Sequence, residues 1–134
     1  MQLPAEAVSA AALIEVVRLT AEPVRPADPF TGDSVALWTA EEAASALALI
    51  ASLLGSGQHR CGYHPGWAVR AYDSDLTPAL FEAQFCFGCH EVRLHGPAVP
   101  PPLAKQFFDP AAPESRALLA RFRAAAAGPG MITP

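Results

Sequence analysis

The sequence predicts an α+β fold, with two helices packed on one face of an antiparallel sheet of about five strands. The chain has 134 residues, of which 51% are hydrophobic and 16% charged. This composition suits a single domain, residues 1–134, with one core. Apolar and polar residues alternate between positions 67 and 95, which is the period of strands. In residues 40–54 and 113–125 the apolar side chains recur every three or four positions, which is the period of helices.

The N-terminal part of the chain predicts two strands joined by a loop. Residues 13–19 (LIEVVRL) are rich in β-branched side chains, which favours a strand. Residues 20–34 contain three prolines and a glycine, which interrupt regular structure, so we expect a loop there. Residues 35–38 then form a short second strand.

The helix over residues 40–54 has recognisable ends. Thr39 and Glu42 have the spacing of a capping box, and Gly55 is suited to end a helix in a left-handed conformation. The apolar residues expected on its buried face are Leu47, Ile50, Ala51 and Leu54.

Residues 67–95 predict a three-stranded antiparallel meander. The apolar faces of its first two strands coincide only if odd-numbered residues oppose odd-numbered residues, because a one-residue slip turns a strand over. The pairs that satisfy this condition are Ala71–Phe81, Val69–Ala83 and Trp67–Phe85. This register leaves residues 74–78 as the loop and puts Cys86 opposite Gly66, on the polar face.

A proline-rich segment and a helix complete the chain. Residues 97–102 (PAVPPP) predict a polyproline-like spacer that ends the sheet. Residues 113–125 predict a helix with Pro113 in its first turn, and we expect a frayed tail over residues 126–134. The helix should pack inward through Leu118, Leu119, Phe122 and Ala125.

Charge and hydropathy exclude two classes of partner. The net charge is −4, Lys105 is the only lysine and the arginines are scattered, which argues against nucleic acid. No apolar run approaches the roughly 20 residues needed to cross a membrane. Glu6 and Glu15 interrupt any apolar leader, so we expect a cytoplasmic protein.

The cysteines and histidines predict a metal site, because all seven lie between positions 59 and 95. Cys61 and His64 form a CxxH motif, and Cys86 and Cys89 form a CxxC motif beyond a hairpin. Two such pairs brought to one end of a sheet can hold tetrahedral Zn²⁺. The predicted ligands are the three cysteines, with His64 or His90 in the fourth position.

We expect the CxxC turn to be a tight knuckle in which Gly88 adopts a positive φ. Four protein ligands leave no position for water, so the zinc would be structural. The domain would then present a rigid surface to a protein partner. The two other histidines, His59 and His95, are expected to be solvated or locally hydrogen-bonded.

Three alternatives remain open for the cysteines. Cys61, Cys86 and Cys89 could form a thiol–disulfide or redox-sensing centre, or they could be inert thiols that fill the core. The segment from Cys86 to His90 also matches CxxCH, the attachment motif of c-type haem. Haem is disfavoured because no export leader is evident and the residues after His90 predict a strand.

The C-terminal part of the chain resembles a group of small uncharacterised bacterial proteins. The features that carry the resemblance are a lone Cys ahead of a strand, the hairpin into FCFGC at residues 85–89, and FFDP followed by an amphipathic helix. It extends from about residue 60 onward. The resemblance implies an α+β layout and no particular reaction.

Overall fold

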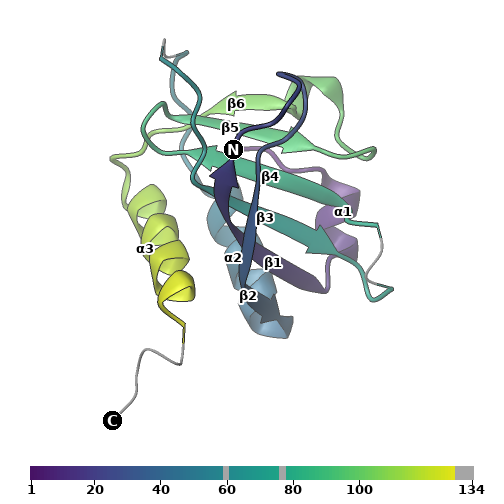
Figure 1. Cartoon of the computed structure of the whole chain (residues 1–134). Helices are drawn as coiled ribbons and strands as arrows, with labels where there is room; N and C mark the ends of the chain where they lie inside the picture. Colours follow the sequence, from purple (N-terminus) through teal and green to yellow (C-terminus); the bar gives the residue numbers. More distant parts are fainter. Residues whose placement is uncertain (59–60, 76–77, 129–134) are drawn as a thin grey trace.

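The computed structural model describes residues 1–58, 61–75 and 78–128, and its sheet has six antiparallel strands in the order β2-β1-β3-β4-β5-β6 (Figure 1). The strands are β1 (Leu13–Ala21), β2 (Thr31–Thr39), β3 (Trp67–Tyr72), β4 (Phe81–Cys86), β5 (Glu91–His95) and β6 (Lys105–Phe107). The helices are α1 (Ala5–Ala10), α2 (Ala40–Ala51), the short 3-10 helix η1 (Pro101–Leu103) and α3 (Pro113–Ala127). The predicted α+β class, with two main helices packed on the sheet, is confirmed.

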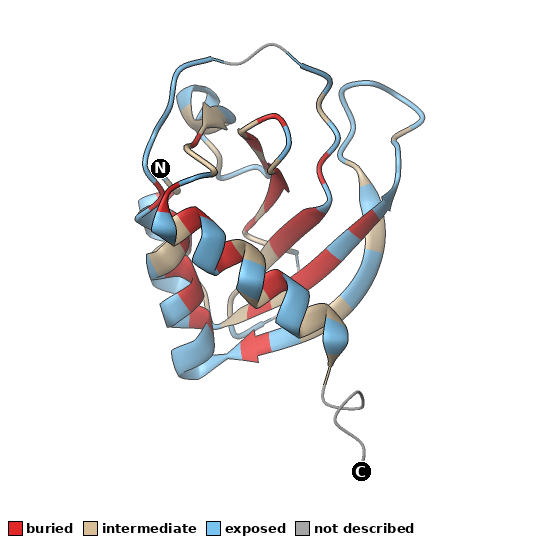
Figure 2. Ribbon diagram, turned by 90° about the vertical axis from the view of Figure 1, so that its left-hand side faces the viewer, coloured by how far each residue is buried: buried red, intermediate tan, exposed pale blue. Residues whose placement is uncertain are grey.

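The meander has the predicted register. Ala71 pairs with Phe81, Val69 with Ala83 and Trp67 with Phe85, so the odd-numbered side chains share one face. That face is the core, and Figure 2 shows buried residues on the sides of the helices that face the sheet. One apolar face per strand was therefore enough to determine which residues pair.

Helix α3 is held to the sheet by aromatic side chains. The Phe122 ring is fully buried and lies 5.5 Å from Trp67, 5.6 Å from Phe85 and 6.2 Å from Trp38 between ring centroids. Leu118 is also fully buried, whereas the other two residues expected to pack inward, Leu119 and Ala125, are half-buried against the core. The predicted buried face of this helix is confirmed at Leu118 and Phe122.

The loop predicted over residues 20–34 is shorter in the structure. Strand β1 continues to Ala21 and β2 already begins at Thr31, so the connecting loop is residues 22–30. All of its prolines lie before Thr31, and the residues that follow gain backbone hydrogen bonds by pairing with β1. Helix α1, in the alanine-rich lead-in, was not predicted.

Helix α2 differs from the prediction at both ends. Thr39 is the N-cap residue but its side chain makes no capping hydrogen bond, so the predicted capping box is wrong. Strand β2 runs through Thr39, and Ala40 turns the chain with a φ of 49°. The helix ends at Ala51, and Leu54 is 55% exposed rather than buried. The residues that form the buried stripe are Ala43, Ala46, Leu47 and Ile50.

The proline-rich segment does not end the sheet, contrary to prediction. The last two residues of this segment, 101 and 102, belong to η1. The chain then continues as β6, which pairs with β5 and is the sixth strand. Helix α3 begins at Pro113 as expected but extends to Ala127. The first two residues of the predicted tail, 126 and 127, are therefore helical, and residues 129–134 lie outside the described part of the chain.

The second face of the sheet is partly covered. Val17, Leu19 and Ala68 form a small buried cluster there with Phe30 from the loop of residues 22–30. Gln84 on the same face is fully buried, and it donates to the carbonyl of Phe30 and accepts from its N–H. Side chains that the alternation assigns to a polar face are thus shielded from solvent.

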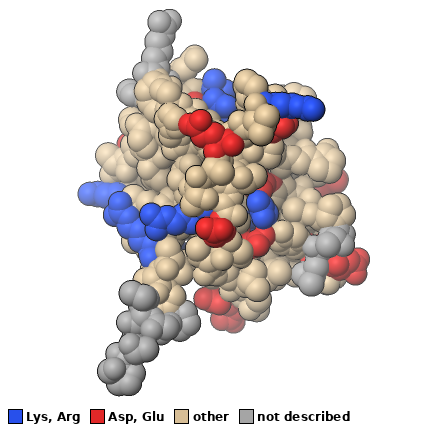
Figure 3. Space-filling view, in the orientation of Figure 1, with Lys and Arg blue, Asp and Glu red and all other residues tan. Residues whose placement is uncertain are grey.

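A network of charges lies on this second face, between β1, β3 and β4. The Arg70 guanidinium lies 2.6 Å from a carboxylate oxygen of Glu82 and 3.4 Å from one of Glu15. Tyr72 donates its hydroxyl to Glu15 at 2.8 Å. In the view of Figure 3 acidic side chains are spread over this side of the molecule, and several basic side chains gather at its left edge.

We expect Glu15→Gln to reduce stability in a pH-dependent way. Burial acts to raise the pKa of Glu15, but hydrogen bonds from Tyr72 and Ser34 and the Arg70 charge outweigh it and lower the pKa below its ordinary value of 4.5. A lowered folded-state pKa stabilises the fold above pH 4.5, and this contribution is lost as the pH falls through the folded value. Urea unfolding should show a loss of about 1 kcal/mol at pH 7 that shrinks as the pH is lowered below 4.5. A constant difference would contradict the assignment.

Gly32 in β2 is required where the strand passes β1. A Cβ atom at this position would overlap the carbonyl oxygen of Arg18 and crowd the backbone of Leu19. We expect Gly32→Ala to lower the free energy of unfolding by about 1–3 kcal/mol, because backbone must move to admit the methyl group. Gly57→Ala is the matched control, since its Cβ would meet no atom within 4 Å. Equal stability of the two variants in urea would refute this close approach.

Candidate functional site

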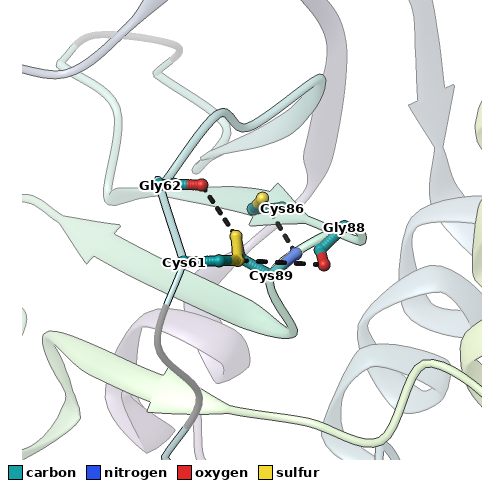
Figure 4. The surroundings of a disulfide bond; sticks show 5 residues. All are labelled: Cys61, Gly62, Cys86, Gly88 and Cys89. Atoms are coloured by element: carbon teal, nitrogen blue, oxygen red, sulfur yellow. Dashed lines mark hydrogen bonds between the residues drawn. A yellow bond between two sulfur atoms is a disulfide. The ribbon is translucent and has the colours of Figure 1, made fainter.

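The structure brings two cysteines together in a disulfide. Cys61 and Cys89 are bonded through their sulfur atoms, with 5.8 Å between the Cα atoms and a sequence separation of 28 (Figure 4). Cys89 lies in the turn between β4 and β5, and Cys61 begins residues 61–66, which we call the cysteine strap. The predicted meeting of the CxxH and CxxC segments is therefore present.

Cys86 stands beside this pair as a free thiol. It is the last residue of β4, and its Sγ accepts a hydrogen bond of 3.3 Å from the backbone N–H of Cys89. It lies on the second face of the sheet as predicted, but it is only 2% exposed. A position on the polar face thus does not expose this thiol to solvent.

Backbone carbonyls surround the bonded sulfurs. The Sγ atom of Cys89 lies 2.7 Å from the carbonyl oxygen of Gly62, and that of Cys61 lies 3.9 Å from the carbonyl oxygen of Gly88. When the bond is reduced, each thiol can donate to the carbonyl beside it. The two cysteines differ in access, since Cys61 is exposed and Cys89 is buried.

The left-handed residue of the turn is His90 rather than Gly88. His90 has a φ of 62°, whereas Gly88 is not among the residues with positive φ. A Cβ at Gly88 would meet nothing within 4 Å, so this position does not need glycine for space either. The carbonyl of His90 accepts from the N–H of Phe108, which anchors the turn to the segment after β6.

The predicted metal ligands are only partly assembled. The imidazole of His64 is exposed and its Nδ1 lies 3.4 Å from a carboxylate oxygen of Glu22. Within residues 1–58, 61–75 and 78–128, no group of three or more His, Cys, Asp or Glu side chains has the arrangement of a metal site. His59, one of the two histidines expected to be solvated, falls outside these ranges.

His95, the other histidine expected to be solvated, is half-buried on the second face. Its Nε2 atom is buried and has no hydrogen-bond partner among the described residues. Burial lowers the pKa of His95, although the charge of Glu82 acts in the opposite direction. The imidazole is therefore neutral at pH 7.

Tyr63, which no sequence pattern singles out, connects the cysteine strap to the sheet. Its ring lies edge-on to Phe30 at 5.7 Å, and the Arg93 guanidinium lies 3.8 Å from the ring centroid. The Tyr63 hydroxyl donates to the carbonyl of Gln84 at 3.3 Å. Burial raises the pKa of Tyr63 well above its usual range, so this hydroxyl stays protonated.

Comparison of the chain with models of known protein families, with curated proteins and with solved structures finds no match. The resemblance to small bacterial proteins therefore stays a prediction. No helix in the part of the chain that the structure describes has the length and apolar character to cross a membrane.

Proposed function

We propose that the protein is a thiol–disulfide switch in which oxidation joins Cys61 to Cys89. The observation that carries this proposal is the pairing of their sulfur atoms across 28 residues of sequence. Both cysteines lie at segments that the rest of the fold already holds in place, through Tyr63 on one side and the β4–β5 turn on the other. The pair can thus form without rearrangement of the sheet.

The difference in exposure assigns the order of events. A small disulfide such as oxidised glutathione reacts with the exposed Cys61 thiolate, which gives a mixed disulfide and releases one glutathione thiolate. The Cys89 thiolate then attacks the Cys61 sulfur and expels the second glutathione. In total two thiols lose two protons and two electrons, and one glutathione disulfide becomes two glutathiones.

The state of this bond determines how firmly the cysteine strap is held. In the oxidised protein the strap is tied covalently beside Cys89, and the N–H of Gly66 donates to the carbonyl of Phe85. In the reduced protein the strap keeps its noncovalent contacts alone, which include those of Tyr63, the His64–Glu22 contact and these backbone hydrogen bonds. We place the switch in the cytoplasm, where the glutathione pool can both form and reduce an accessible disulfide.

Equilibration in glutathione buffers of different redox poise tests the switch. After acid quenching and alkylation with N-ethylmaleimide in denaturant, which exposes the buried thiols, the intact mass should change from three adducts to one as the buffer becomes oxidising. Cys86→Ser should retain a transition, from two adducts to none, whereas Cys61→Ser should remain at two adducts throughout. Three adducts in every buffer would overturn the proposal and leave the thiols as structural residues.

A structural zinc site is the second candidate. Its support is that Cys61, Cys86 and Cys89 lie together at the β4–β5 turn, and that a backbone N–H donates to one of their sulfur atoms. The N–H of Cys89 bonded to Cys86 Sγ is the kind of contact that orients thiolate ligands of a metal. Cys61, Cys86 and Cys89 would supply three ligands, and His64 or His90 the fourth. Native mass spectrometry of the reduced protein should then show one zinc that Cys86→Ser removes. A metal-free mass after purification with zinc present would reject this candidate.

A further inference from the structure

A cavity of about 420 Å³ lies on the second face of the sheet, beneath the loop of residues 22–30. Phe30 and Tyr63 line one part of it, and Arg93 and His95 of β5 line another. An adjoining hollow of about 320 Å³ shares Phe30, Tyr63 and Arg93 with it. Volumes of this size are typical of sites for small molecules.

The charged groups around the cavity favour an anion. Arg93 and Lys105 supply two positive charges to its lining, against the single carboxylate of Asp28. Glu22 lines the adjoining hollow, and His95 is neutral. Arg93 is paired through Nε with Glu91, which uses one of its five N–H donors. Lys105 is exposed, and its ammonium lies 5.7 Å from the Phe107 ring centroid, so it adds positive charge at the rim.

Apolar surface makes up the rest of the wall. The rings of Phe30 and Tyr63 meet edge to face, and Ala104 also lines the cavity. A flat apolar group can pack against these rings while a carboxylate at its end reaches Arg93, whose planar guanidinium matches a carboxylate.

We propose that this cavity binds a small organic acid with a planar apolar body, its carboxylate held by Arg93 and Lys105 and its body packed against Phe30 and Tyr63. The site combines side chains of the loop of residues 22–30, of the cysteine strap through Tyr63, and of β5 and β6. Binding of an anion there involves no thiol–disulfide exchange, so the test below uses the oxidised protein throughout.

Titration of the ¹⁵N-labelled, oxidised protein with benzoate tests the site by chemical-shift perturbation. Benzoate should shift the signals of residues lining the cavity, including the side-chain amide of Gln84. Benzamide has the same ring without the charge, and it should bind at least tenfold more weakly. Arg93→Gln should weaken benzoate binding at least tenfold, and Lys105→Gln severalfold.

Arg123→Gln is the matched control, because it removes the same charge from the exposed side of α3, away from this cavity. It should bind benzoate as the native protein does. Lys105 is exposed, so its variant keeps the test valid even if Arg93→Gln unfolds. No shifts at the lining residues, equal affinity for benzoate and benzamide, or unchanged binding in Lys105→Gln would each overturn the proposal.

Discussion

We expect Cys61→Ser to lower the free energy of unfolding of the oxidised protein by about 3.5 kcal/mol. The Cys61–Cys89 bond closes a long loop, with a sequence separation of 28, and so restricts the unfolded chain. The loop includes all of β3 and β4, whose own pairing is unaffected by the substitution. Guanidinium unfolding of the native and variant proteins, both oxidised, measures the difference.

Two controls isolate the contribution of the bond. Reductant should lower the stability of the native protein to about that of Cys61→Ser and should leave Cys61→Ser unchanged. Cys86→Ser should keep most of the difference between oxidised and reduced protein, because Cys86 is the free thiol. Equal stability of the native protein with and without reductant would show that the bond does not contribute.

Phe122→Ala should destabilise the protein by about 3–5 kcal/mol. The Phe122 ring is fully buried and contacts Trp38, Trp67 and Phe85, so its loss leaves a cavity between α3 and the sheet. The surrounding rings come from three different strands and cannot collapse readily into that space. Urea unfolding followed by tryptophan fluorescence measures the effect.

Leu37→Ala is a suitable comparison for Phe122→Ala. Leu37 is 60% exposed on β2, so removing its side chain should change stability by less than about 0.5 kcal/mol. A loss below 1 kcal/mol for Phe122→Ala would contradict the description of α3 as anchored to the sheet by this ring.

The meander was predictable because one constraint fixes it. The alternation over β3 and β4 allows the apolar faces to coincide only when Trp67 pairs with Phe85 and the other odd-numbered residues follow. The amphipathic stripe of α3 was similarly local, and Leu118 and Phe122 are buried as expected. These features depend on residues close together in the sequence and on the register of a single strand pair, β3 with β4.

Features that depend on distant segments were missed. Strand β6 has three residues and exists because η1 brings the chain back to β5, which no local pattern indicates. The burial of Gln84 and Cys86 depends on Phe30 and Tyr63, which reach the same face from elsewhere in the sequence. Alternation predicts which face a side chain occupies, but not whether another segment covers that face.

The candidate site was predictable in its location and not in its chemistry. The CxxH and CxxC segments were expected at one end of the sheet, and Cys61 and Cys89 do meet there. Motif spacing does not distinguish a disulfide from a set of metal ligands, because both need sulfurs within reach of each other. The orientation of His64 toward Glu22 depends on the loop of residues 22–30, which carries no such signal in sequence.

Mass mapping of the disulfide tests the central claim most directly. The protein is oxidised with glutathione disulfide and unfolded in denaturant, and its free thiols are then blocked with N-ethylmaleimide. Digestion with trypsin and chymotrypsin separates Cys86 from Cys89 at Phe87. We predict that the peptide beginning at Cys61 is linked to the peptide carrying Cys89, with the maleimide adduct on Cys86. A link from Cys61 to Cys86, a Cys86–Cys89 bond, or three maleimide adducts would contradict the account.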